Sequence, residues 1–113
     1  MDAIKENWPT IKETLRREYS LSDISYRTWV EPLEFYNIVD DVINIIIPSD
    51  LAKALNYISS RYKSFFQVTI TEMFDHEYDI NFILEKEAKA QDMYDMDVNV
   101  STPVYKINNE KAN

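Results

Sequence analysis

The segment of residues 42–47, Val-Ile-Asn-Ile-Ile-Ile, constrains the fold more than any other part of the chain. Successive side chains of a β-strand point to opposite faces of its sheet. One face therefore receives Ile43, Ile45 and Ile47, and the other receives Val42, Asn44 and Ile46. A sheet with water on one side carries more polar residues there than this strand offers. We therefore expect a sheet with helices covering at least part of each face.

Two amphipathic helices are expected before this strand. Apolar residues of the first recur at steps of four, three and four, at Ile4, Trp8, Ile11 and Leu15. Pro9 is tolerated in a first turn but costs about 3 kcal/mol in a helix interior, so the regular helix should begin close to Trp8. The second helix should begin at Ser22 or Asp23, both good N-caps, and end at Pro32. Its apolar side carries Tyr26, Trp29, Val30 and Leu33.

A β-hairpin is expected after the second helix. Residues 33–39 and 42–47 are both rich in branched and aromatic side chains, which favour strands. Asp40 and Asp41 lie between them and are expected to form the turn. Pro48 ends the second strand.

A long helix and a last strand complete the pattern. Ser49 and Asp50 are expected to cap the helix. Its apolar stripe consists of Leu51, Leu55, Ile58, Tyr62, Phe65, Phe66, Thr69, Ile70 and Met73. The pattern breaks at residues 75–79, and alternation over residues 78–84 predicts a strand. The order helix–helix–strand–strand–helix–strand predicts a small α+β domain with a three-stranded sheet packed with helices.

Composition excludes several kinds of site. The 113 residues include no cysteine, no glycine and one histidine, His76. Disulfides, thiolate zinc sites, multi-histidine metal sites and glycine-rich phosphate loops are therefore ruled out. We expect no enzyme, no cofactor and no metal, since no nucleophile–base pair is visible either. Composition thus favours a binding protein over a catalyst.

Charge and hydropathy bear on partners and location. The net charge is −8, from 12 basic and 20 acidic residues, and DNA repels such a chain unless its cations cluster. No apolar run approaches the roughly 18 residues of a membrane span, and the first residues lack a signal-peptide pattern. We expect weak or no nucleic-acid binding, no membrane association and a cytoplasmic location.

The chain is expected to divide at residue 84. Residues 1–84 carry the periodic apolar patterns, whereas residues 85–113 are polar and lack a sustained period. We interpret the second part as a linker or flexible tail, with at most a fraying helical turn or two over residues 85–91.

Several segments together resemble one known family. They are Trp8 to Leu15, ISYRTWVEPL at residues 24–33, INIIIPSDLAKAL at residues 43–55, SSRY at residues 59–62 and DINFIL at residues 79–84. In order and spacing, residues 4–84 resemble the N-terminal domain, domain I, of the bacterial replication initiator DnaA. The resemblance implies a compact fold like a KH domain. It also implies initiator self-association, as a weak homo-oligomer, and contact with the replicative helicase and regulatory proteins.

The resemblance also implies partner-binding residues. Trp8 holds the place of an early aromatic residue that supports self-association in the family. Ser25 stands at a position, often acidic in the family, that contributes to helicase contact. Ser49, Asp50 and Leu51 replace the asparagine-x-phenylalanine that usually carries helicase or regulator contact. Residues 85–113 would be the start of the initiator's flexible second domain.

Two other functions stay open at this point. The chain lacks the ATPase and DNA-binding parts of a full-length initiator, so it is a fragment of one or a stand-alone regulator that competes for the same partners. Alternatively, Arg61 and Lys63 could contact single-stranded nucleic acid, as KH-like surfaces do.

Each candidate residue also has a purely structural interpretation. Trp29 is expected in the core with Tyr26 and Leu33, whereas Trp8 could be core or a half-exposed contact. Leu51 could likewise be core or contact. His76 is interpreted as a solvated turn residue, and the remaining acids as turn residues without a metal: Asp40, Asp41, Asp75, Glu77 and Asp79.

Overall fold

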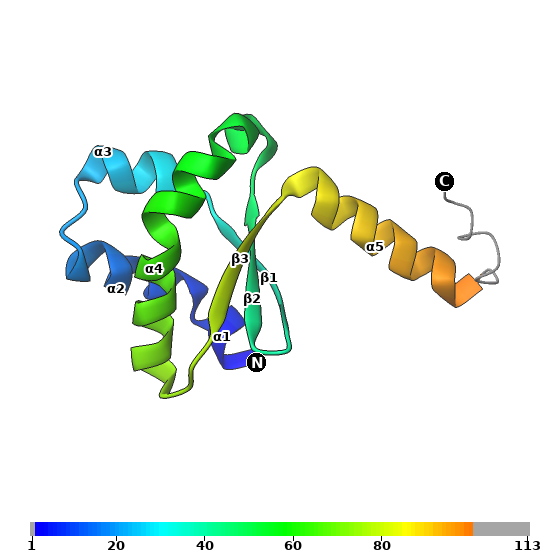
Figure 1. Ribbon diagram of the computed structural model, residues 1–113, viewed down its shortest axis with the longest axis horizontal. Coiled ribbons are helices and arrows are strands. Elements are labelled where there is room, and N and C mark those ends of the chain that lie inside the picture. Colours follow the sequence, from blue (N-terminus) through cyan, green and yellow to red (C-terminus); the bar gives the residue numbers. More distant parts are fainter. Residues whose placement is uncertain (1, 101–113) are drawn as a thin grey trace.

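The computed structural model describes residues 2–100 of the chain. Its elements are α1 (Asp2–Glu6), α2 (Trp8–Glu18), α3 (Asp23–Ser25), a π-helical turn (Tyr26–Val30), β1 (Glu34–Val39), β2 (Val42–Ile47), a 3-10 helix (Ser49–Ala54), α4 (Leu55–Phe74), β3 (Asp79–Leu84) and α5 (Glu85–Val100). The predicted α+β class and element order are confirmed, with the first predicted helix divided into α1 and α2 (Figure 1).

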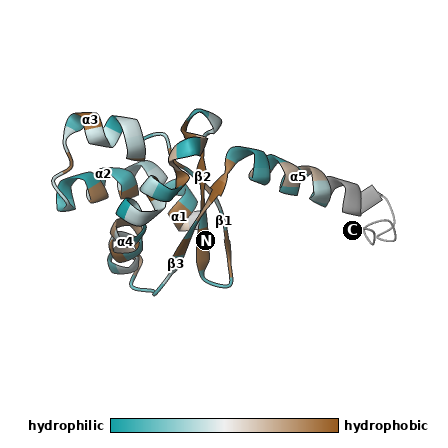
Figure 2. Cartoon of the chain, turned by 45° about the horizontal axis from the view of Figure 1, so that its top comes forward, coloured by the Kyte–Doolittle hydropathy of each residue, from teal (hydrophilic) through white to brown (hydrophobic). Residues whose placement is uncertain are grey.

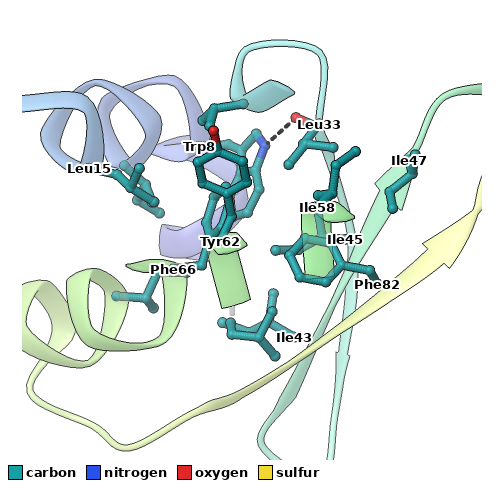
Figure 3. Packing of buried hydrophobic residues seen from close by; sticks show 14 of the residues in the cluster. Trp8, Leu15, Leu33, Ile43, Ile45, Ile47, Ile58, Tyr62, Phe66 and Phe82 are labelled. Carbon is teal, nitrogen blue, oxygen red and sulfur yellow. Dashed lines mark hydrogen bonds between the residues drawn. The ribbon is translucent and has the colours of Figure 1, made fainter. Parts of the chain in front are cut away.

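One face of the three-stranded sheet forms the core. The strands lie in the order β1-β2-β3, with β2 antiparallel to β1 and parallel to β3. The three core-facing isoleucines of β2 are fully buried and meet the apolar sides of α2 and α4 (Figure 3). The buried cluster consists of Ile4, Trp8, Ile11, Leu15, Val30, Leu33, Ile43, Ile45, Ile47, Ile58, Tyr62, Phe66, Ile70, Ile80 and Phe82. Met73, expected in the stripe of α4, is exposed.

The second face of the sheet is polar at its centre and covered at one end. Asn81 donates a hydrogen bond to Asn44 at 2.9 Å, and Asn44 donates one to Asn37 at 2.7 Å, so an amide ladder crosses all three strands. At the end of β2 the start of α5 covers the sheet, and Ala88 is only 3% exposed there. The expectation of a helix over part of each face is therefore confirmed, although the sequence did not identify α5 as the helix that covers this one.

The turns adopt left-handed backbone conformations without glycine. Asp40 and Asp41 have φ angles of 53° and 63°, the pattern of a tight two-residue hairpin turn. Asp75 ends α4 with φ 52° and ψ 44°. Aspartate is one of the few residues that adopt this region readily, because its short polar side chain can hydrogen-bond locally. The predicted hairpin and the break after α4 are both confirmed.

Asp75 provides a test of this backbone conformation. Replacing Asp75 by glycine should raise the free energy of unfolding by up to about 1 kcal/mol, because glycine adopts a positive φ without the penalty of a Cβ atom. Replacement by alanine should lower it by a similar amount. Urea unfolding followed by circular dichroism measures both changes, and equal stabilities of the two variants would contradict the expectation.

Two of the three helix starts predicted from the sequence agree with the structure, and the third does not. α2 begins at Trp8, with Pro9 in its first turn. The Ser22 hydroxyl accepts a hydrogen bond from the Ser25 amide at 3.1 Å, as expected of an N-cap. The expected capping by Ser49 and Asp50 is wrong. Pro48 is the N-cap residue of the 3-10 helix, and its side chain makes no capping hydrogen bond.

The segment after β3 is a helix over a longer range than expected. α5 begins directly at Glu85 and runs to Val100, projecting away from the body (Figure 1). Residues 101–113 lie outside the described residues. The division of the chain at residue 84 stays a prediction.

Candidate functional site

Trp8 lies in the core and not on the surface. The side chain is 4% exposed and stacks on Phe66, with ring centroids 5.6 Å apart. Its indole N–H donates a hydrogen bond to the Leu33 carbonyl at 3.0 Å (Figure 3, dashed line). The alternative of a half-exposed ring is therefore wrong, because the apolar sides of α4 and β1 close over it. A role of Trp8 in self-association stays a prediction.

Like Trp8, Lys12 of α2 donates hydrogen bonds to backbone carbonyls of the segment that leads into β1. Its Nζ donates to the carbonyls of Glu31 at 2.6 Å and Leu33 at 3.2 Å. Burial lowers the pKa of Lys12 below its ordinary value, and the nearby carboxylates of Glu34 and Glu31 oppose this effect. The ammonium group therefore satisfies carbonyls where the π-helical turn ends.

Trp29, and not Trp8, is the tryptophan that reaches the surface. Its ring is half-buried and packs against Tyr57 of α4, with centroids 5.0 Å apart. Tyr57 is 48% exposed, and Ile24, five residues before Trp29, is 78% exposed. Trp29 was expected in the core, and it does pack against the core cluster, but it is only partly buried there. We refer to Trp29 and Tyr57 as the Trp29–Tyr57 pair.

Ser25 lies on the same stretch of chain as Trp29. It is half-buried at the end of α3, and its backbone amide is satisfied by Ser22. Its side chain carries no charge, so the acidic character that the family often shows at this position is missing.

The 3-10 helix contains the other three predicted contact residues. Ser49 and Asp50 are exposed, whereas Leu51 is half-buried and packs against the core cluster. The 3-10 helix leads directly into α4, which carries Tyr57. The segment is therefore a continuous surface feature with an apolar anchor on its inner side.

The comparison with protein families identifies this fold. The family model described as the DnaA N-terminal domain matches residues 5–74. The chain belongs to the DnaA N-terminal domain family. Over 91 residues it is 33% identical to the chromosomal replication initiator protein DnaA of Lachnoclostridium phytofermentans. That alignment covers 79% of this chain and 20% of the relative, so the chain spans about a fifth of the relative's length. The resemblance seen in the sequence is confirmed.

The two cations proposed for nucleic-acid contact are not gathered into one patch in this DnaA N-terminal domain. Arg61 and Lys63 are both exposed on α4, but residues two apart on a helix do not share a face. The Arg61 guanidinium lies 5.6 Å from the centroid of the Tyr62 ring. Lys63 faces Asp79 at 3.9 Å. Their contact with nucleic acid stays a prediction.

The acidic turns contain one close polar pair. His76 Nε2 lies 3.1 Å from a carboxylate oxygen of Asp41, and both side chains are exposed. Within residues 2–100, no cluster of three or more histidine, aspartate or glutamate side chains could hold a metal ion. None of the described helices is long and apolar enough to cross a bilayer.

Two residues of this DnaA N-terminal domain escaped the sequence analysis. Tyr57 lies outside the apolar stripe of α4, and an aromatic residue in such a position is itself a signal of a surface contact. Lys12 lies four residues after Trp8 and three before Leu15, which places a lysine on the apolar side of α2. That placement could have indicated a buried ammonium group.

Proposed function

We propose that the chain is a non-catalytic protein–protein interaction module of a bacterial replication initiator. In the cytoplasm it mediates weak self-association of the initiator and contacts the replicative helicase or regulatory proteins. The relative named above is a chromosomal replication initiator, which supports the setting.

The Trp29–Tyr57 pair is the observation that supports a binding role. Aromatic side chains at the surface are the residues that contribute most often to binding energy, because a rigid ring buries a large area at small entropic cost. Tyr57 is 48% exposed and is backed by the half-buried Trp29 ring. The exposed Ser49 and Asp50 precede it on the same continuous segment. The available patch is small, so we expect weak and transient affinities.

The test compares two exposed tyrosines. Tyr57→Ser should weaken binding to the cognate replicative helicase, and to the full-length initiator, by about 30-fold if Tyr57 contributes a typical hot-spot energy. Tyr94→Ser is the matched control, since Tyr94 is 42% exposed on α5. Biolayer interferometry measures the affinities, and thermal unfolding verifies that both variants are folded. Equal affinities for the two variants would contradict the proposed binding surface.

A further inference from the structure

α5 is attached to the body by contacts of its first two turns. The Glu85 carboxylate accepts a hydrogen bond from the Ser49 amide at 2.9 Å. The Tyr36 hydroxyl donates one to the Asp92 carboxylate at 2.6 Å, which raises the pKa of Tyr36 to about 12. Between these two contacts, Ala88 is 3% exposed. Two hydrogen bonds and one buried side chain, all on one side of the helix, therefore fix residues 85–92 against the domain.

The surface under these turns belongs to the second face of the sheet. An open groove of about 340 Å³ lies where the docked turns of α5 meet this face. Its lining is Pro32, Glu34, Tyr36, Ile46, Pro48, Glu85, Ala88, Lys89 and Asp92. Pro32, Pro48 and Ile46 are apolar residues of this lining, as is the buried Ala88. In Figure 2 the teal start of α5 follows directly from the brown end of β3.

Ser49 is the first residue of the 3-10 helix that contains the predicted contacts Asp50 and Leu51. The first amides of any helix have no partner within the helix and need an outside acceptor. Pro48 precedes Ser49 and offers no side-chain acceptor for the Ser49 amide. Glu85 supplies that acceptor from a segment 36 residues away in the sequence. A carboxylate is also the favoured charge at a helix start.

The charge state of Glu85 agrees with this geometry. The Ser49 amide, and secondarily Lys89, lower the pKa of Glu85 below its ordinary value of 4.5. Lys89 Nζ lies 3.4 Å from the second carboxylate oxygen. The carboxylate is thus held ionised where it meets the amide.

We propose that Glu85, held in place by the docked first two turns of α5, is a positioning residue that caps the 3-10 helix and preorganises Ser49–Leu51 for partner binding. The first two turns of α5 then contribute to partner binding by positioning Glu85 and are not only a linker. The capping claim concerns the chain alone, whereas its consequence for partner binding rests on the proposed function.

The capping claim is tested by amide hydrogen exchange in the full chain. Glu85→Ala should increase exchange at the Ser49 amide about fivefold, as expected for the loss of a helix cap. Glu85→Gln should retain part of the protection, because its amide oxygen can still accept the bond. Unchanged Ser49 exchange in Glu85→Ala would overturn the proposal.

The docking of α5 is tested by the same substitution at two alanines of this helix, one buried and one exposed. Ala88→Asp places a charge at the buried position and should increase exchange at Ser49 as Glu85→Ala does. Ala90→Asp adds the same charge to an exposed position of the same helix and should leave Ser49 unchanged. An equal effect of the two substitutions would overturn the role of the docked helix.

The pH dependence provides a readout that a purely structural role of α5 would not give. The depressed pKa of Glu85 means that its stabilising contribution is present above pH 4.5 and is lost as the pH falls through the lowered value. The Ser49 amide chemical shift should therefore titrate below pH 4.5 in the wild type and not in Glu85→Gln. A shift that titrates alike in both proteins would contradict the proposal.

The consequence for binding is measured with the replicative helicase. Glu85→Ala should weaken binding about fivefold, since the preorganised helix start is lost. If Tyr57→Ser weakens binding and Glu85→Ala does not, the positioning role is overturned and the proposed function stands. If neither variant changes binding while Ser49 exchange rises in Glu85→Ala, the proposed function fails and the capping claim stands.

Discussion

Replacing Trp8 by alanine should lower the free energy of unfolding by about 3–5 kcal/mol, the range for large aromatic residues deleted from a core. The ring stacks on Phe66 and also contacts Phe35, whose centroid lies 5.7 Å away. The substitution leaves a cavity and removes the hydrogen bond to the Leu33 carbonyl. Urea denaturation followed by circular dichroism measures the change.

Trp8→Phe is the control for this substitution. It retains most of the aromatic volume but not the indole N–H, so it should cost less than the alanine variant. A loss of under about 1 kcal/mol in Trp8→Ala would contradict the burial of the ring. The expected instability also affects studies of self-association: a monomeric Trp8→Ala protein is informative only if it is shown to be folded.

Replacing Lys12 by methionine should lower the free energy of unfolding by about 1.5–3 kcal/mol, the range for hydrogen bonds to a charged group. Methionine preserves the aliphatic stem of the side chain but offers no donor. The Glu31 carbonyl would then lose the bond that measures 2.6 Å in the wild type. Chemical denaturation again measures the effect.

Lys5→Met is the matched control, since Lys5 is exposed on α1. It should change the free energy of unfolding by less than about 0.5 kcal/mol, as is usual for surface substitutions. Equal effects of the two lysine variants would show that the ammonium group of Lys12 does not hold the chain entering β1.

The elements of this domain could be predicted because their signals are local. Alternation in residues 42–47 identified β2, and the turn at Asp40 and Asp41 identified the hairpin. Both depend on backbone geometry that a few neighbouring residues determine. The start of α2 near Pro9 followed in the same way from the missing amide hydrogen of proline. Membership of the DnaA N-terminal domain family followed from the combination of such segments in order.

The candidate site was harder to predict because exposure is not a local property. Both tryptophans lie on apolar helix faces, and periodicity does not distinguish them. Trp8 is buried because α4 and β1 close over it, whereas Trp29 is left half-buried beside Tyr57. Trp8, for which the sequence left core and half-exposed contact both open, is in the core, and Trp29, expected in the core, packs against it but is only half-buried.

The sequence by itself determined the order of helices and strands, the glycine-free turns and the need to cover both faces of the sheet. Only the tertiary structure decided which aromatic ring meets solvent, that Lys12 holds two carbonyls and that Glu85 caps a helix 36 residues away. The physical reason is range: backbone conformation and apolar periodicity are set by near neighbours in the chain. Burial and long-range hydrogen bonds are set by whichever distant segment packs against them.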